Sequence, residues 1–203
     1  MKPRKTFSAP FESPLEELFA QTLQPLLKKS VQLIPQYAIE TLWGKFRIDF
    51  AIKNDDKIIG VECDGETVHG TEAQLYDTWR DIIILNENII TVIYRFSGTS
   101  LLKNIPAAVY AFYLCEPHIF AKRHISVLQQ NISQDLFQEL KGKITNLDNF
   151  DLPVCEKDSE KTSLRIRKHS RITADQYQIY KFLMENTGKR INPLIYKYLK
   201  QKT

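Results

Sequence analysis

The spacing of apolar residues predicts a helix near the start of the chain. An apolar face at helical spacing follows Ser13 and consists of Leu15, Leu18, Phe19 and Leu23. The start of this helix has the pattern of a capping box, with Ser13 as the N-cap, Pro14 at the first helical position and Glu16 at the third. We therefore expect the helix to begin directly after Ser13.

Three extended segments are expected next, at residues 31–41, 45–53 and 57–64. Pro35 confines the first to a sheet edge or delays its start. The second alternates cleanly, so Ile48, Phe50 and Ile52 should share one face, opposite Asp49, Arg47 and Ala51. Asn and Asp residues at 54–56 favour a hairpin turn between the second and third segments.

The remaining pattern predicts a helix over 72–86 and a β-branched strand over 89–96 at the centre of the sheet. The order so far is α-β-β-β-α-β. Helical regions at 99–115 and 119–141 follow. A basic strand-like piece (LRIRKHS) and helical patterns at 173–186 and 192–201 come last. These patterns divide the chain into a core at 1–142, a polar linker at 143–162 and a small basic C-terminal region at 163–203.

Composition narrows the class of protein. The chain has 203 residues, of which 43% are hydrophobic and 26% charged, which is typical of a soluble globule rather than a disordered chain or coiled coil. No apolar run approaches the roughly 18 residues that span a bilayer, and no secretory signal is visible, so we expect no membrane association. The three cysteines are widely spaced and form no CxxC pair. A reducing, cytoplasmic location follows as the expectation.

Charge is unevenly distributed along the chain. Residues 1–152 hold 16 Lys+Arg against 19 Asp+Glu, a net −3, whereas residues 153–203 hold 12 against 5, a net +7. This segregation favours either a polyanionic partner such as nucleic acid or a solvated basic surface. The densest basic cluster could contact phosphates or form a solvated strand, and it consists of Arg165, Arg167, Lys168, His169 and Arg171.

Strand alternation predicts a cluster of carboxylates. If residues 45–53 and 57–64 form a hairpin, Asp49, Glu62 and Asp64 converge on one face. Gathered carboxylates need a compensating cation or proton, and hard oxygen ligands suit Mg²⁺ or Mn²⁺. Gly60 indicates a close approach to the backbone nearby. The alternative is a face of the hairpin that is simply exposed to water.

Five pieces of sequence, in order, carry a resemblance to a known family. They are SPLEE, RIDFAI, VECDGETVH, DTWRD and VIYRF, and they lie between Ser13 and about Ser97. This segment, under half of the chain, resembles the PD-(D/E)XK nuclease superfamily. Within the superfamily it resembles the branch of very short patch repair endonucleases and a group of small nuclease-like domains. The resemblance implies an α/β, restriction-endonuclease-like core with a mixed central sheet flanked by helices.

The resemblance also assigns metal-binding roles. Asp49 would be the central metal ligand and Glu62 the second carboxylate. Glu16 would bind the metal through water, with Glu17 as the alternative if the register differs by one. Glu16 also suits a purely structural capping role.

The other roles fall on residues around this pair. Asp64 stands where the superfamily usually has Lys, so it could bind metal or accept a proton instead. His69 would then handle a proton, although it could be an ordinary surface residue. Arg80 would contact a phosphate or pair with Asp77 on the same helix face. Arg95 allows the same two interpretations.

The function expected from the resemblance is Mg²⁺- or Mn²⁺-dependent hydrolysis of DNA phosphodiester bonds. The alternative is a catalytically inactive nucleic-acid-binding or complex-assembly module with the same fold. A third, less favoured alternative is a metal-dependent enzyme that acts on a nucleotide or another phosphoester. The C-terminal region could bind DNA, a protein partner or a second copy of the chain.

Overall fold

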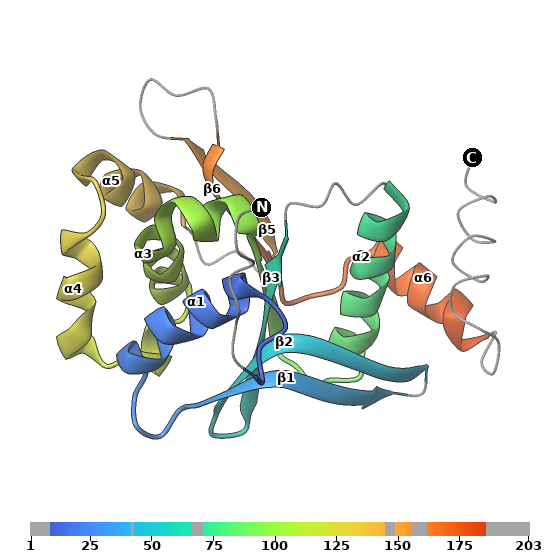
Figure 1. The fold of residues 1–203 in the computed structure, drawn as a ribbon. Coiled ribbons are helices and arrows are strands. Elements are labelled where there is room, and N and C mark those ends of the chain that lie inside the picture. Colours follow the sequence, from blue (N-terminus) through green and yellow to red (C-terminus); the bar gives the residue numbers. More distant parts are fainter. Residues whose placement is uncertain (1–8, 42, 66–70, 145–148, 156–161, 186–203) are drawn as a thin grey trace, which may run out of the picture.

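The protein is an α/β structure with a mixed six-stranded sheet flanked by helices (Figure 1). The computed structural model describes residues 9–41, 43–65, 71–144, 149–155 and 162–185. The strand order is β1-β2-β3-β4-β6-β5. Helices α1, α3, α4 and α5 lie on one side of this sheet, and α2 and α6 lie on the other.

Helix α1 (Pro14–Leu23) begins where the capping pattern predicts. The Ser13 hydroxyl accepts a hydrogen bond from the Glu16 backbone N–H at 3.2 Å. The apolar face of α1 packs Phe19 and Leu23 into the core, so capping and periodicity agree. A short 3₁₀ turn, η1 (Gln24–Leu26), ends the segment.

The three expected extended segments form an antiparallel meander. They are β1 (Gln32–Thr41), β2 (Gly44–Asn54) and β3 (Lys57–Asp64). β1 is an edge strand, which is where Pro35 can be accommodated without a missing ladder bond. Asp55 has a φ of 53° in the turn between β2 and β3, a conformation that Asp tolerates. The predicted edge strand and hairpin turn are both confirmed.

The clean alternation expected along β2 is wrong at Asp49. Phe50 and Ile52 pack on the α1 and α3 side of the sheet, whereas Ile48 packs with Ala51 on the α2 side. The ladder with β1 pairs residues on both sides of Asp49 but is interrupted opposite it, where Gln36 has a φ of 51°. This irregularity turns β2 at Asp49 and changes which side chains share a face.

Helix α2 (Thr71–Asn86) connects β3 to β4 (Val92–Ser97), which runs parallel to β3. β4 lies between β3 and β6, so its predicted central position is confirmed. Helix α3 (Gly98–Cys115) is kinked at Asn104, two residues before Pro106. The proline explains the kink because it cannot donate the helical hydrogen bond.

The single helical region expected over 119–141 is wrong. The structure instead has two short 3₁₀ turns and two helices, and the helices are separated by Asn131 to Ser133. The Ser133 hydroxyl accepts from the Leu136 backbone N–H and so begins a new helix rather than continuing the old one. The elements are η2 (Pro117–Ile119), η3 (Lys122–His124), α4 (Ile125–Gln130) and α5 (Gln134–Lys143).

The C-terminal part of the described chain extends the sheet beyond β4. β5 (Phe150–Cys155) lies within the stretch expected to be a linker, and β6 (Thr162–His169) forms from the basic strand-like piece. β6 pairs antiparallel with β4, and β5 pairs with β6 at the sheet edge. Helix α6 (Ala174–Met184) matches the pattern expected at 173–186, whereas the pattern at 192–201 lies outside the described residues.

Two apolar layers enclose the sheet. The larger layer lies under α1 and α3 and includes Phe96, whose ring contacts the rings of Phe19 and Phe112. The smaller layer lies under α2 and includes Trp79 and Ile83. Within the described part of the chain, no helix is both long and apolar enough to cross a membrane.

Candidate active site and its ion-pair network

The candidate site lies where β2 separates from β3. Register pairing between these strands runs from Asn54↔Lys57 as far as Phe50↔Val61. Beyond the Phe50↔Val61 pair, the Asp49 Oδ2 atom accepts a hydrogen bond from the Cys63 backbone N–H at 2.7 Å. A side-chain carboxylate thus takes the acceptor position that a neighbouring strand would otherwise fill. This bond fixes Asp49 beside the last residues of β3.

The environment of Asp49 disfavours its charged form. Burial raises the pKa of Asp49, the Cys63 N–H lowers it, and the nearby charges of Glu16 and Asp64 raise it again. The result is a pKa of about 6, against an ordinary value of 3.8. A cation or a proton would relieve this unfavourable charge.

Glu62 is the second buried carboxylate and is only 6% exposed. Its Oε1 atom accepts from Nη2 of Arg80 on α2 at 2.6 Å. Burial raises the pKa of Glu62 well above its ordinary range, because the attraction of Arg80 only partly offsets it and the charge of Asp49 adds to it. Arg80 lies 3.9 Å from Asp77, so the contact with Glu62 is much the closer.

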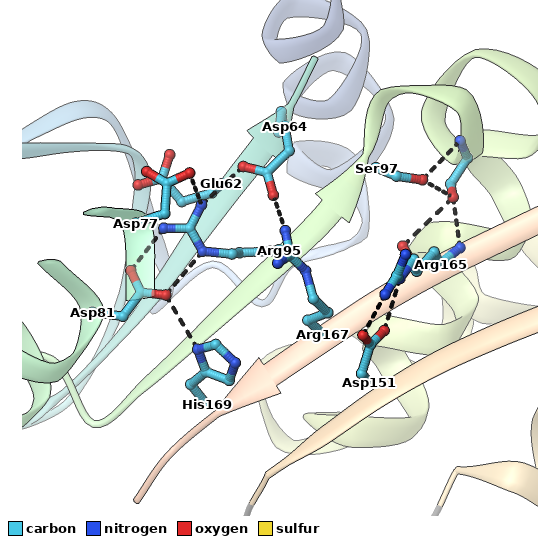
Figure 2. Close-up of polar contacts among 12 residues, drawn as sticks. Glu62, Asp64, Asp77, Asp81, Arg95, Ser97, Asp151, Arg165, Arg167 and His169 are labelled. Atoms are coloured by element: carbon cyan, nitrogen blue, oxygen red, sulfur yellow. Dashed lines mark hydrogen bonds and ion pairs between the residues drawn. The ribbon is translucent and has the colours of Figure 1, made fainter. Parts of the chain in front are cut away.

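Asp64, the third predicted carboxylate, binds arginines (Figure 2). Its Oδ1 atom accepts from Nη1 of Arg95 on β4 at 2.9 Å, and its Oδ2 atom accepts from Nη2 of Arg167 on β6 at 2.5 Å. Two guanidinium groups therefore already compensate the charge of Asp64. The charge of Asp64 acts on Asp49, but the sequence did not identify these arginine partners.

Arg95 and Asp81 form the buried centre of the network. Nε and Nη2 of Arg95 donate to the two carboxylate oxygens of Asp81 at 2.9 and 2.7 Å, and both side chains are 2% exposed. Burial alone would raise the pKa of Asp81, but Arg95 outweighs burial and holds that pKa far below its ordinary value. Nδ1 of His169 lies 3.2 Å from Asp81. A bidentate pair of this kind fixes α2 to the centre of the sheet.

Glu16 is buried near Asp49 but has its own partners. Its Oε2 atom accepts from the Glu12 backbone N–H at 3.0 Å and from Nε2 of Gln36 at 2.5 Å. Glu16 therefore ties α1 to the irregular position of β1 opposite Asp49. The alternative, Glu17, is half-buried on the same helix. His69 lies outside the described residues.

The described carboxylates and guanidiniums do not balance in charge. Five carboxylates lie among three guanidinium groups, so the carboxylates outnumber the guanidiniums by two, and Glu16 beside Asp49 is a further carboxylate. The two carboxylates with raised pKa are Asp49 and Glu62. In the described ranges, no group of three or more His, Cys, Asp or Glu side chains is arranged to hold a metal ion. The five carboxylates are Asp49, Glu62, Asp64, Asp77 and Asp81, and the three guanidiniums are those of Arg80, Arg95 and Arg167.

The predicted basic cluster lies mainly on β6, and both of its arginines on that strand are ion-paired with acidic residues. Arg165 donates to both oxygens of Asp151 at 2.9 and 2.5 Å, and Arg167 reaches Asp64. Lys168 pairs in register with Tyr94 on the neighbouring strand, and the Arg171 backbone N–H donates to the Asn149 side chain at 3.1 Å. The cluster is therefore part of the sheet rather than a separate basic arm.

Comparisons of the chain with protein-family models, with curated proteins and with solved structures found no match.

Proposed function

We propose that the protein is a metal-dependent nuclease that hydrolyses nucleic-acid phosphodiester bonds, with DNA as the expected substrate. The observation that carries this proposal is the pair of buried carboxylates with raised pKa, Asp49 and Glu62, on neighbouring strands. Buried titratable groups with perturbed pKa values are typical of active sites. The observed order α1-β1-β2-β3-α2-β4 is also the order that the sequence resemblance implies for a restriction-endonuclease-like core.

The charge excess supports a divalent cation at this pair. The two carboxylates with raised pKa, Asp49 and Glu62, can be neutralised by two protons or by one divalent ion. Carboxylate oxygens suit Mg²⁺ or Mn²⁺, and Mg²⁺ is commonly held by one or two carboxylates together with water. A pair of carboxylates is therefore sufficient in chemistry for Mg²⁺, even though no larger ligand group is found among the described residues.

The chain's own residues would have distinct tasks in this reaction. Asp49 and Glu62 would hold the ion, which when bound supplies an activated water and neutralises phosphate charge. Arg80 would orient Glu62 through their 2.6 Å contact and add positive charge for a phosphate. The Cys63 N–H would keep Asp49 in place. His69 and Glu16 remain candidates for proton handling and for water-mediated binding.

A second candidate function is a non-catalytic nucleic-acid-binding or assembly module. The pairing of Asp64 with Arg95 and Arg167 favours it, because an ion-paired Asp at this position neither activates water as a cation nor needs a metal. The nuclease and the non-catalytic module predict different effects of Asp49→Asn on the cleavage and binding of DNA.

The test is cleavage of supercoiled plasmid and of labelled single-stranded DNA by the full chain, with Mg²⁺, with Mn²⁺ and with EDTA. Asp49→Asn removes the charge but keeps an oxygen that can accept from the Cys63 N–H. Glu62→Gln is the second variant, and Glu40→Gln, which alters the exposed pair with Lys45, is the matched control. We expect the first two to lose at least about 100-fold in rate, since loss of outer-sphere partners alone costs 10–100-fold. The control should cleave normally.

Each outcome decides between the candidates. Metal-dependent cleavage that is lost in Asp49→Asn and Glu62→Gln supports the nuclease. DNA binding without cleavage, unchanged by Asp49→Asn, supports the non-catalytic module. Inhibition by free nucleotides at concentrations that do not affect DNA binding would indicate a nucleotide phosphoester as the substrate.

A further inference from the structure

A row of charged residues crosses the sheet beside the candidate site. Glu62 on β3 is in register with Arg95 on β4, and Arg95 is in register with Arg167 on β6. Asp64 accepts from both arginines, so their guanidinium groups lie on the same face of the sheet (Figure 2). Neighbouring strands are about 4.8 Å apart, which places the Arg167 backbone roughly 10 Å from that of Glu62.

The two guanidinium groups differ in what they can still bind. Arg95 is 2% exposed and is committed to Asp81 through two hydrogen bonds. The Arg167 side chain is 33% exposed, and its contact with Asp64 engages Nη2. A guanidinium carries five N–H donors in a planar fork, so a group held at one nitrogen can still donate to a second anion. Arg167 is therefore the accessible cation of the pair.

A second arginine continues the row along β6. Arg165 precedes Arg167 by two residues, so the two side chains emerge on the same face of the strand, about 7 Å apart along it. Arg165 is 54% exposed, and Asp151 holds it through two hydrogen bonds, whereas Asp64 holds Arg167 through one. Each arginine is thus anchored by one acidic partner and open to solvent. Fixed, exposed guanidiniums in a line suit the phosphates of an extended strand.

We propose that Arg167 binds a backbone phosphate of the nucleic-acid strand next to the Asp49 and Glu62 site, with Asp64 holding its guanidinium in position. This inference rests on the proposed function for the substrate class. The C-terminal strand β6 is then part of the substrate-binding surface. Asp64 contributes by orienting the guanidinium group of Arg167, which lies 103 residues further along the chain.

The simplest competing explanation is structural. The Arg167–Asp64 bond could serve only to fasten β6 to the sheet. Such a bond would affect the free energy of unfolding but not the number of phosphates contacted. The salt dependence of binding separates the two roles, because it reports how many phosphates the protein neutralises.

The experiment measures binding of a fluorescein-labelled single-stranded DNA oligonucleotide to the full chain by anisotropy, in EDTA, over a range of KCl concentrations. Arg167→Gln should weaken binding about 10-fold, as expected for loss of a charge-assisted hydrogen bond. The slope of log K against log[KCl] should become less steep by about 0.7, the value for one phosphate of a single strand. Arg123→Gln is the matched control, since Arg123 is exposed on η3, on the α3 side of the sheet.

A second comparison guards against misfolding. Asp64→Asn and the double variant Asp64→Asn/Arg167→Gln differ only at Arg167. In both variants position 64 is uncharged, so the loss of Arg167 does not leave a carboxylate there without its ion pair. The double variant should bind more weakly than Asp64→Asn and with a less steep slope, but the loss should be less than about 10-fold because Asp64 no longer holds Arg167 in position. Equal affinity and equal slope in both comparisons would overturn the proposal, as would an equal loss in Arg123→Gln. Because binding is measured in EDTA, without divalent ions, the result tests the role of Arg167 whether or not the protein cleaves DNA.

Discussion

The buried pair of Arg95 and Asp81 gives the sharpest test of the network, through the substitution Arg95→Met. The change removes two hydrogen bonds, of 2.9 and 2.7 Å, between side chains that are each 2% exposed. Removing one partner of a buried ion pair costs about 3–5 kcal/mol, because the other charge is left without compensation. For a chain of 203 residues this corresponds to a fall in Tm of roughly 6–20 °C.

The loss of stability in Arg95→Met should depend on pH, and the direction of this dependence follows from the pKa of Asp81. In the native protein that pKa is held far below its ordinary value, mainly by Arg95 against the effect of burial. The resulting stabilisation is present above the unfolded pKa of about 4 and is lost as the pH falls further. In Arg95→Met, burial is no longer opposed by Arg95, so Asp81 should destabilise the fold as the pH rises above about 4. The difference between the two proteins should therefore be largest near pH 7 and shrink toward pH 4.

Urea unfolding, followed by the fluorescence of Trp43 and Trp79, measures this difference. Arg165→Met is the matched control, because it makes the same change in an exposed pair with Asp151, where the expected cost is about 0–1 kcal/mol. A loss in Arg95→Met no larger than in this control, or a loss that does not change with pH, would refute the assignment of Arg95 and Asp81 as the buried centre of the network.

Four further substitutions or additions test separate parts of the structure. Asp49→Asn, without divalent ions, should raise the free energy of unfolding by about 1–3 kcal/mol at pH 8 and leave it unchanged at pH 4, because a raised carboxyl pKa costs stability only as the pH rises above the unfolded value. Mg²⁺ should raise the Tm of the native chain but not that of Glu62→Gln, in thermal melts with and without the ion. Gly60→Val should lose about 1–3 kcal/mol in urea unfolding, since an added Cβ would already lie 3.2 Å from Ile48 Cδ1. Ser13→Ala should lose about 1 kcal/mol by the same measurement, because it removes the cap of α1.

Elements with a local signature could be predicted from the sequence. Ser13 marks the start of α1 through its own hydroxyl, and Asp55 adopts the turn conformation that its residue type favours. Helix α2 and the central strand β4 follow from periodicity and β-branched content. In each case the deciding interaction lies within a few residues of the signal.

Features that depend on distant residues could not be predicted in the same way. Nothing local in Phe150–Cys155 or Thr162–His169 indicates that these strands continue the sheet next to β4. The irregularity at Asp49 depends on Gln36 across the β1–β2 ladder. A local signal was available at one point, since Ser133 precedes a helix in the manner of an N-cap and divides the region predicted as one helix.

The ion pairs at Asp64 change which residues the proposed metal would need. Arg95 and Arg167 already compensate Asp64, so a cation gains least by approaching that carboxylate. Asp49 and Glu62 are the described carboxylates of the network whose charged forms the fold disfavours, and they are where a divalent ion would gain most. An Asp at position 64 is therefore compatible with a working site if its task is to orient arginines. Weakened DNA binding in Arg167→Gln together with lost cleavage in Asp49→Asn is the combination that this division of tasks requires.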